Sequence, residues 1–194
     1  MNEAEELSSG SDRSTPPQTP ELLLTTTRFV LRPVADSDLL DVGRMYADPA
    51  VVAGYPGGRT LTLGEIRRGI AYWRKQWSEH GHSVFVIRER IGGAFVGTAG
   101  LRPTDAKGVA ELGAVIDRNW WNRGVATEVG AALLTWGFDV LALGRVVMPD
   151  VSNPASAHLI EKAGGRITAR NSNTTSWEVE PGAFRTARDA NVDR

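Results

Sequence analysis

Hydrophobic and polar residues follow one another along seven short stretches in the pattern of strands. These stretches span residues 27–32, 84–88, 95–101, 110–116, 145–148, 166–170 and 175–179. Gly92-Gly93 and the polar residues 105–108 separate the second, third and fourth stretches as hairpin turns do. The pattern therefore predicts three consecutive hairpin-connected strands in the middle of the chain.

Apolar residues recur at helical spacing in two longer stretches. One helical face carries Ile66, Ile70, Trp73 and Trp77. Thr62 and Glu65 precede that face as a capping-box pair. The second face follows Gly124, should stop at Gly144, and carries Val125, Val129, Leu133, Trp136 and Val140. Two shorter helices are predicted, one from Asp36 to the Asp48-Pro49 stop and one from Asn153-Pro154 to Gly164-Gly165.

The order of these elements predicts the fold class. It reads β-α-α-β-β-β-α-β-α-β-β. Hairpins in the middle of the chain and a helical crossover later require both antiparallel and parallel strand pairs. We therefore expect a single α/β domain (α+β with a mixed central sheet).

Composition limits the chemistry that the chain can carry. The 194 residues are 41% hydrophobic and 23% charged, which is typical of one globular domain. Cysteine is absent, which excludes disulfides, thiolate metal sites, iron–sulfur clusters and a cysteine nucleophile. His80 and His82 have no metal-ligand partners in the pattern, so no metal is expected. Lack of cysteine also fits a cytoplasmic protein.

Charge is distributed unevenly along the chain. The formal net charge is -1, and the first 20 residues carry four acids and one base, so the rest holds +2. A body this close to neutral argues against a nucleic-acid partner. The most apolar stretch, residues 131–143, contains Asp139 and is too short to span a membrane. We expect neither a nucleic-acid nor a membrane partner.

The termini differ in composition from the body. Residues 1–20 are rich in Ser, Glu, Pro and Thr with few apolar side chains, so they predict a disordered tail. Residues 188–194 are similar in composition. We therefore expect a folded domain over residues 21–184 and a flexible C-terminus over residues 185–194.

A strand leads directly into a helix through Asn122, Arg123 and Gly124. Gly, and Asn better than most residues, tolerate left-handed backbone, which leaves successive N–H groups uncovered. Those N–H groups and the positive end of the helix dipole would form an anion cradle suited to a pyrophosphate. An ordinary strand-to-helix turn remains the alternative. Neither a P-loop nor a GxGxxG turn is present.

Several segments appear in a family's order: TTTRFVLRP, Asp48-Pro49, VGTAGLRP, ELGAVID, WWNRGVATE and NPASAHLIEKAGG. Together they resemble the GNAT superfamily of acyl-CoA-dependent N-acetyltransferases over about residues 22–180. They are similar to the branch like RimJ and RimL, which acetylates protein N-terminal amines. The resemblance implies a mixed sheet splayed between the fourth strand, residues 110–116, and the fifth, residues 145–148.

The resemblance also implies a site for acetyl-CoA. The family's pyrophosphate motif and its next residue fall on Trp121, Asn122, Arg123, Gly124, Val125, Ala126 and Thr127. Trp121 stands at a Gln/Arg position, and Asn122 stands where the branch usually has Gly. Backbone groups of Val115 and Ile116 would pair with the pantetheine arm, although both residues are equally ordinary core strand. Asn153 and Ser156 match the family's Asn-x-x-Ser near pantetheine.

Two residues are the implied catalytic groups. Glu111 would be the base that takes the proton of the attacking ammonium, and Ser156 would protonate the leaving thiolate. The alternatives are a solvent-facing glutamate and a hydroxyl that bonds the helix backbone. Asp150 is a reserve base, and Ile160 stands where many relatives carry a tyrosine acid. His158 is more typical of packing or surface.

The resulting hypothesis is an acetyl-CoA-dependent N-acetyltransferase that acts on a primary amine by direct attack. The alternative is a non-catalytic acyl-CoA-binding sensor on the same fold. The acceptor side should involve the two early helices and the loop 54–59, where Tyr46, Tyr55 and Tyr72 lie in or near these elements. A protein N-terminus, a polyamine, an antibiotic and a metabolite all remain open as acceptor, as does a homodimer.

Overall fold

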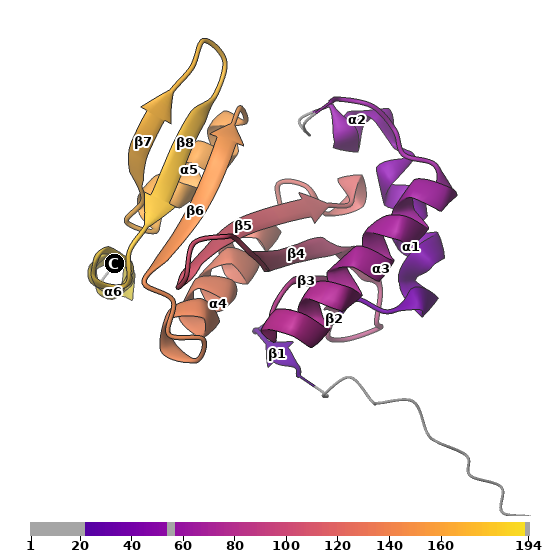
Figure 1. Cartoon of the computed structure of the whole chain (residues 1–194), viewed down its shortest axis with the longest axis horizontal. Coiled ribbons are helices and arrows are strands. Elements are labelled where there is room, and N and C mark those ends of the chain that lie inside the picture. The colour runs from indigo at the N-terminus through magenta and orange to yellow at the C-terminus, as the bar shows by residue number, and fades with distance from the viewer. Residues whose placement is uncertain (1–21, 54–56, 193–194) are drawn as a thin grey trace, which may run out of the picture.

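An eight-stranded mixed sheet crosses the computed structural model, which describes residues 22–53 and 57–192 (Figure 1). The strand order is β1-β2-β3-β4-β5-β6-β8-β7. The predicted tail over residues 1–20 and the loop residue Tyr55 lie outside the described residues. The α/β class with a mixed sheet is confirmed, because β5 and β6 pair in parallel and the other neighbouring strands pair antiparallel.

The elements have the following bounds. The strands are β1 (Leu24–Thr25), β2 (Phe29–Pro33), β3 (Val84–Glu89), β4 (Phe95–Pro103), β5 (Val109–Ile116), β6 (Arg145–Val151), β7 (Arg166–Arg170) and β8 (Thr175–Val179). The helices are α1 (Leu39–Tyr46), α2 (Pro49–Val52), α3 (Leu63–His80), α4 (Val125–Asp139), α5 (Pro154–Lys162) and α6 (Pro181–Val192). Two 3-10 turns are η1 (Asp36–Asp38) and η2 (Arg118–Trp120).

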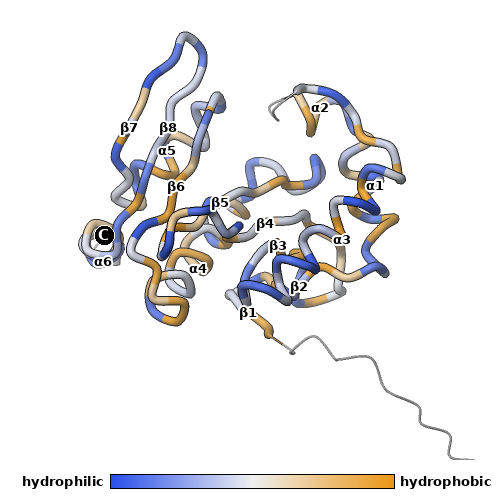
Figure 2. Tube along the Cα trace, in the orientation of Figure 1, coloured by the Kyte–Doolittle hydropathy of each residue, from blue (hydrophilic) through white to orange (hydrophobic). Residues whose placement is uncertain are grey.

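Helices cover both faces of the sheet and bury a separate core on each. Phe85 and Ile87 of β3 face the core that α4 covers, whereas Val86 between them faces the core under α1 and α3. Such alternation along one strand follows from the two-residue period of β structure. Figure 2 shows apolar stretches on α4 and β6, which both supply the first core.

The second core holds α1 and α3 against β3 and β4. Its residues on α1 and α3 include Val42, Met45, Tyr46, Ile66 and Ile70. Burial of several aliphatic and aromatic side chains, each contributing about 1.5–3 kcal/mol relative to exposure, fixes these helices on the sheet. The apolar helical face predicted over residues 66–77 is confirmed. Its last residue, Trp77, packs in the core that α4 covers.

Three features of the fold differ from the sequence pattern. The pair β1–β2 begins earlier than the predicted first strand. Asp48-Pro49 does not merely stop α1: Asp48 accepts a hydrogen bond from the Ala50 N–H at 2.8 Å and opens α2. Val140 lies past the end of α4 and is exposed, so it does not belong to the apolar face of that helix.

The C-terminal boundary is corrected by α6. Polar composition predicts a flexible segment over residues 185–194, but residues 185–192 belong to this helix. Phe184 is the cause, because it is buried against Phe138 with ring centroids 5.7 Å apart. Arg185 also pairs with Asp139 at 3.0 Å. A buried aromatic pair and an ion pair therefore hold α6 against the end of α4.

The capping box of α3 is formed as predicted. The Thr62 N–H donates to Glu65 Oε2 at 2.8 Å, and the Glu65 N–H donates to Thr62 Oγ1 at 3.3 Å. Hydrogen bonds from Arg59 and then from Thr62 lower the pKa of Glu65 to about 2. The box therefore keeps an ionised Glu65 at neutral pH, and it weakens only as the pH falls toward that value.

Thr62→Ala should lower the stability of the domain. Loss of an N-cap side chain costs about 1 kcal/mol, which corresponds to a melting temperature lower by about 2–4 °C for a domain of this size. Thr60→Ala is the matched control, since Thr60 is exposed and offers only its backbone carbonyl, to Arg59. Thermal unfolding of both variants checks this, and equal melting temperatures would contradict the role of the cap.

Candidate active site

The junction between β5 and α4 has the backbone that the sequence predicts for an anion cradle. Gly124 is the N-cap of α4 with φ 70° and ψ 13°, and Asn122 has φ 58°. Both residues are therefore left-handed, as expected for Gly and Asn at these positions. Gly124 contributes no side-chain cap to the helix. The first-turn N–H groups of α4 thus point out of a positive helix end toward the turn.

An arginine near the N-terminal end of the described residues contacts this turn. Arg28 donates from Nη1 to the Arg123 carbonyl at 2.8 Å and from Nε to Glu128 Oε2 at 2.7 Å. Glu128 also accepts from the Thr26 hydroxyl at 2.6 Å. Partial burial raises the pKa of Glu128, but hydrogen bonds from Thr26 and Arg28 outweigh it and hold that pKa below its ordinary value. The paired Glu128 thus leaves the helix end electropositive.

The inner edge of β5 is open beside the turn. β5 pairs with β6 only at Val109, Ala110 and Glu111, whereas it pairs with β4 along its whole length. Residues 112–116 therefore have no strand partner on the β6 side in the part of the chain described. This divergence is the splay that the family resemblance implies, and it is visible in Figure 1 as the gap that opens between β5 and β6.

Two aromatic side chains brace the region between this edge and the cradle. Trp121 donates from Nε1 to the Ile116 carbonyl at 2.9 Å, so that carbonyl already has a partner. Arg123 lies over the ring of Trp120 at 5.4 Å from the centroid. The indole of Trp121 thus connects the strand end to the turn, a contact that the motif alone does not indicate.

α5 starts at the same end of the sheet as α4. Parallel strands have their carboxyl ends at one edge, and α4 follows β5 while α5 follows β6. Clefts at such a divergence are the usual place for a ligand in an α/β sheet. Asn153 lies just before α5, where its carbonyl accepts from the Ala157 N–H at 3.1 Å, and Ser156 lies in the first turn.

The reserve base is placed by a β-bulge. The register of β6 and β8 shifts between Met148 and Val151, and Asp150 has φ 52°. Asp150 accepts a hydrogen bond from the Thr174 hydroxyl at 3.2 Å. The bulge accommodates Pro149, which has no N–H to donate to a ladder. Asp150 therefore belongs to the outer β6–β8 side of the sheet.

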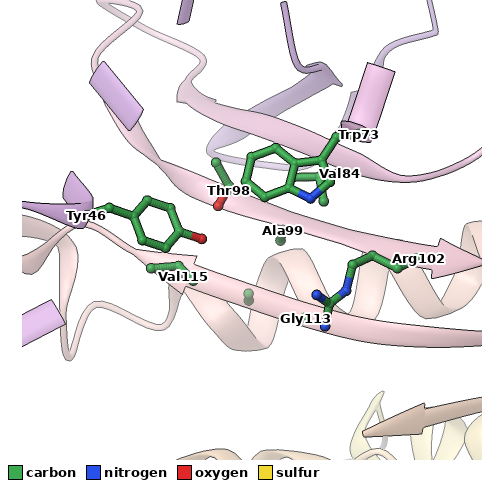
Figure 3. A pocket seen from close by; sticks show the side chains of 9 residues that line it. Tyr46, Trp73, Val84, Thr98, Ala99, Arg102, Gly113 and Val115 are labelled. Atoms are coloured by element: carbon green, nitrogen blue, oxygen red, sulfur yellow. The ribbon is translucent and has the colours of Figure 1, made fainter. Parts of the chain in front are cut away.

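A small pocket opens on the α1–α3 side of β4 and β5 (Figure 3). Its side chains come from α1, α3 and three strands: Tyr46, Trp73, Val84, Thr98, Arg102 and Val115. The hydroxyl of Tyr46, the ring of Trp73 and the guanidinium of Arg102 point into the same space. The cavity volume is about 40 Å³, which is room for a small polar group rather than for a long chain.

Arg102 joins this pocket to Glu111. The two residues lie directly opposite in the β4–β5 register, and their side chains form an ion pair. The Arg102 side chain is 32% exposed and that of Glu111 30%. A Cβ on Gly113 would lie 3.5 Å from Arg102 Nη2, so the guanidinium rests over this glycine. Glu111 is thus a partly exposed carboxylate paired with a residue that lines the pocket.

The expected site residues lie in three groups. Residues 121–127 and the strand end at Val115 and Ile116 are connected through the Trp121 contact. Glu111 is paired with Arg102 on the α1–α3 side of the sheet, whereas Asn153 lies just before α5 and Ser156 lies in its first turn. Arg28 and Arg102 were missed. Equal counting outward from the turn at residues 105–108 pairs 104 with 109, 103 with 110 and 102 with 111, which would have found the second.

Neither a metal-ion cluster nor a membrane-spanning helix is found among the described residues. No group of three or more His, Asp or Glu side chains could hold a metal ion within residues 22–53 and 57–192. Within the same ranges, no helix combines the length and apolar character that crossing a membrane demands.

Comparison with known proteins agrees with this geometry. A family model for the acetyltransferase (GNAT) domain matches residues 28–166. The uncharacterised protein YkkB of Bacillus subtilis (strain 168) is 28% identical over 145 residues, which are 73% of this chain and 83% of YkkB. An acetyltransferase structure from Agrobacterium tumefaciens str. C58 has a TM-score of 0.70 and 27% identity, covering 82% of this chain and 94% of that one.

A structure of RimL, a ribosomal L7/L12 α-N-protein acetyltransferase in complex with coenzyme A, is also similar. Its TM-score is 0.68 at 14% identity, over 81% of this chain and 95% of that one. At this identity the likeness shows the fold alone.

Proposed function

This chain belongs to the GNAT acetyltransferase family, and on that premise we propose that it transfers an acetyl group from acetyl-CoA to a primary amine by direct attack. The observation that carries the proposal is the left-handed, uncapped start of α4 beside the unpaired edge of β5. Uncovered N–H groups at a positive helix end suit phosphate oxygens, and an unpaired strand edge suits an amide-containing arm.

The residues present fit acetyl-CoA. The N–H groups of Val125, Ala126 and Thr127 would bind the pyrophosphate, with Asn122, Arg123 and Gly124 forming the rim. The N–H of Ile116 would pair with the pantetheine arm, since Trp121 already occupies the Ile116 carbonyl. The backbone groups of Val115 face β4 instead, because the Asp117 N–H donates to the Val96 carbonyl of β4 and backbone groups alternate in direction along a strand. Bound acetyl-CoA would supply the acyl group as a thioester. Asn153 would contact the same arm from α5.

The chain's own residues would manage the protons. Glu111 would accept one proton from the acceptor ammonium, directly or through one water, before its nitrogen attacks. As the N–C bond forms and the C–S bond breaks, Ser156 Oγ would protonate the departing sulfur. Ser156 would then regain a proton from the amine nitrogen, so that one proton is released overall. Backbone N–H groups of β5 would stabilise the negative charge that develops on the carbonyl oxygen.

Thiol release tests the proposed function directly. Acetyl-CoA is incubated with a panel of primary amines that includes free amino acids, peptides with free N-termini, and polyamines. Amine-dependent release of coenzyme A supports the acetyltransferase. Tight binding of acetyl-CoA without release for any amine would support the alternative, a sensor on the same fold.

Ser156→Ala should lower turnover by about 10- to 100-fold and leave the affinity for acetyl-CoA nearly unchanged. The hydroxyl acts mainly in the transition state, and a thiolate already leaves fairly well, so the effect lies at the low end for a general acid. Ser152→Ala, at an exposed position before α5, is the matched control. Steady-state kinetics with the best amine of the panel give the answer; wild-type turnover in Ser156→Ala would remove this role.

A further inference from the structure

The acceptor pocket contains a positive charge beside a negative one. Arg102 lines the pocket and Glu111 is its ion-pair partner from the facing strand. Arg102 is the one charged side chain among the described residues that line the pocket. An acceptor with several cationic groups would therefore meet a guanidinium rather than a row of carboxylates. The charge arrangement disfavours a polyamine in this pocket.

Arg102 has unused hydrogen-bonding capacity. Its Nη2 contacts Glu111, whereas its Nε is buried without a hydrogen-bond partner. A guanidinium presents five N–H donors in a planar fork that matches the two oxygens of a carboxylate. A ligand carboxylate that accepts hydrogen bonds from the accessible end of this fork would therefore gain affinity. The position of Arg102 over Gly113 leaves its planar group facing the pocket.

The size of the pocket restricts what reaches Arg102. About 40 Å³ of space accommodates a carboxylate-sized group, while the rest of the ligand must lie toward the opening. The nearby walls are the rings of Trp73 and Tyr46, which offer apolar surface and, at Tyr46, a hydroxyl (Figure 3). The pocket thus combines a carboxylate-matching fork with aromatic walls.

From the proposed acetyltransferase function, we infer that the acceptor is a free amino acid with an apolar side chain. Its carboxylate binds Arg102, its amine faces Glu111, and its side chain lies against Trp73. The guanidinium of Arg102 and the carboxylate of Glu111 then face the carboxylate and the ammonium of a zwitterion. The ligand carboxylate accepts hydrogen bonds from some of the N–H groups of Arg102. Glu111 is thereby left to face the ammonium, which is where the proposed base must act.

The test compares three amines that differ only in the group on the carbon that bears the nitrogen. Phenylalanine carries a carboxylate, phenylalaninamide a neutral amide, and phenethylamine neither. A carboxylate favours the protonated form of a neighbouring amine more than a neutral amide does, so protonation alone would make phenylalanine a poorer acceptor than phenylalaninamide. We expect kcat/KM for phenylalanine to exceed that for each of the other two by about 10-fold or more, an order set by a charged hydrogen-bond pair.

Variants assign the preference to Arg102. Arg102→Gln should lower kcat/KM for phenylalanine by about 10- to 100-fold and change that for phenethylamine much less. Arg102→Lys keeps the charge without the fork and should recover only part of the loss. Arg90→Gln, at an exposed position in the β3–β4 turn, is the matched control. Melting temperature and acetyl-CoA affinity verify that each variant is folded.

The outcomes separate the inference from the function on which it rests. Thiol release that favours phenylalaninamide, phenethylamine or a peptide N-terminus over phenylalanine would overturn the inference and leave the acetyltransferase intact. A carboxylate preference that survives in Arg102→Gln would do the same. No release with any amine of the broader panel, despite acetyl-CoA binding, would overturn both.

Discussion

Gly124→Val is expected to weaken acetyl-CoA binding by about 100-fold or more while the domain stays folded. Two hydrogen bonds to a charged group, at about 1.5 kcal/mol each, account for a loss of that order. A branched side chain at the N-cap would cover the N–H groups that the proposed pyrophosphate site uses. Valine is also poorly suited to the φ of 70° at this position, so the turn itself would shift.

The folding cost of this change should be moderate. A Cβ at Gly124 would come no closer than 3.5 Å to Arg28 Nη2, so no severe clash is introduced. Left-handed backbone costs a non-glycine residue about 1–2 kcal/mol, which a domain of this size tolerates. We therefore expect a large loss of acetyl-CoA affinity together with only a moderate decrease in melting temperature.

Gly130→Val provides the matched control for this experiment. Gly130 lies in the same helix, and a Cβ there would meet nothing within 4 Å. Titration calorimetry with acetyl-CoA and a thermal melt are run on both variants. A folded Gly124→Val with wild-type affinity would remove the cradle from the proposed site.

The sequence was informative where the signal is local. A left-handed Asn122 and Gly124 before an apolar helical face follow from residue type and spacing, and both are confirmed. Thr62 and Glu65 are three residues apart, so their capping box needs no knowledge of the fold. The order of elements is similarly local, because hairpin turns and helix periods lie within short windows.

What the sequence could not show depends on contacts distant in the chain. Arg28 reaches Glu128 across 100 positions, and nothing near either residue announces the pair. α6 depends on Phe184 meeting Phe138, which requires the finished packing. Arg102 opposite Glu111 is intermediate: the hairpin register contains it, but the ion pair changes the interpretation of Glu111 from a free base to a partnered one.

The partnered state of Glu111 also shapes how its catalytic role can be recognised. Glu111→Gln would leave Arg102 without its anion, so lost activity alone would not identify a base. The informative measurement is the pH profile, in which the rise of kcat/KM should move to higher pH because only acceptor that is already neutral reacts. The α-amine of a peptide titrates near about 8 and a lysine amine near about 10, so the shift is easiest to see with an acceptor whose amine has a low pKa.

Asp38→Ala is expected to destabilise the domain by about 3–5 kcal/mol, the usual cost of removing one partner of a buried ion pair. Asp38 has no exposed surface, and it accepts hydrogen bonds from Arg32 at 2.5 and 2.7 Å and from the Ala35 N–H at 2.9 Å. Arg88 adds a contact at 3.1 Å. Without the carboxylate, two partly buried guanidinium groups would lose their shared anion.

The position of Asp38 makes this loss relevant to the site. Asp38 ends η1 and precedes α1, whose last residue, Tyr46, lines the proposed acceptor pocket over β4 and β5. The pair therefore fixes the start of the helix that carries a pocket wall. A partly unfolded α1 should lower acceptor affinity before it affects acetyl-CoA binding, because the proposed cradle lies on α4.

The loss of stability in Asp38→Ala should depend on pH, because the pKa of Asp38 is shifted in the folded protein. Burial raises the pKa of Asp38, but the hydrogen bonds from Arg32 and Ala35 and the charge of Arg32 outweigh burial and lower it. A carboxyl whose folded pKa is depressed stabilises the fold above its unfolded pKa of about 4 and loses that contribution as the pH falls through the folded value. The difference between wild type and Asp38→Ala should thus be full at pH 7 and shrink below about pH 4.

Asp41→Ala is the control that separates burial from charge. Asp41 pairs with the same Arg88 at 2.8 Å, but its side chain is 36% exposed. A pair this accessible contributes about 0–1 kcal/mol. Urea unfolding at pH 7 should place Asp38→Ala well below Asp41→Ala in free energy of unfolding. Equal destabilisation would mean that Arg88, rather than the buried Arg32–Asp38 pair, holds η1 and α1 on the sheet.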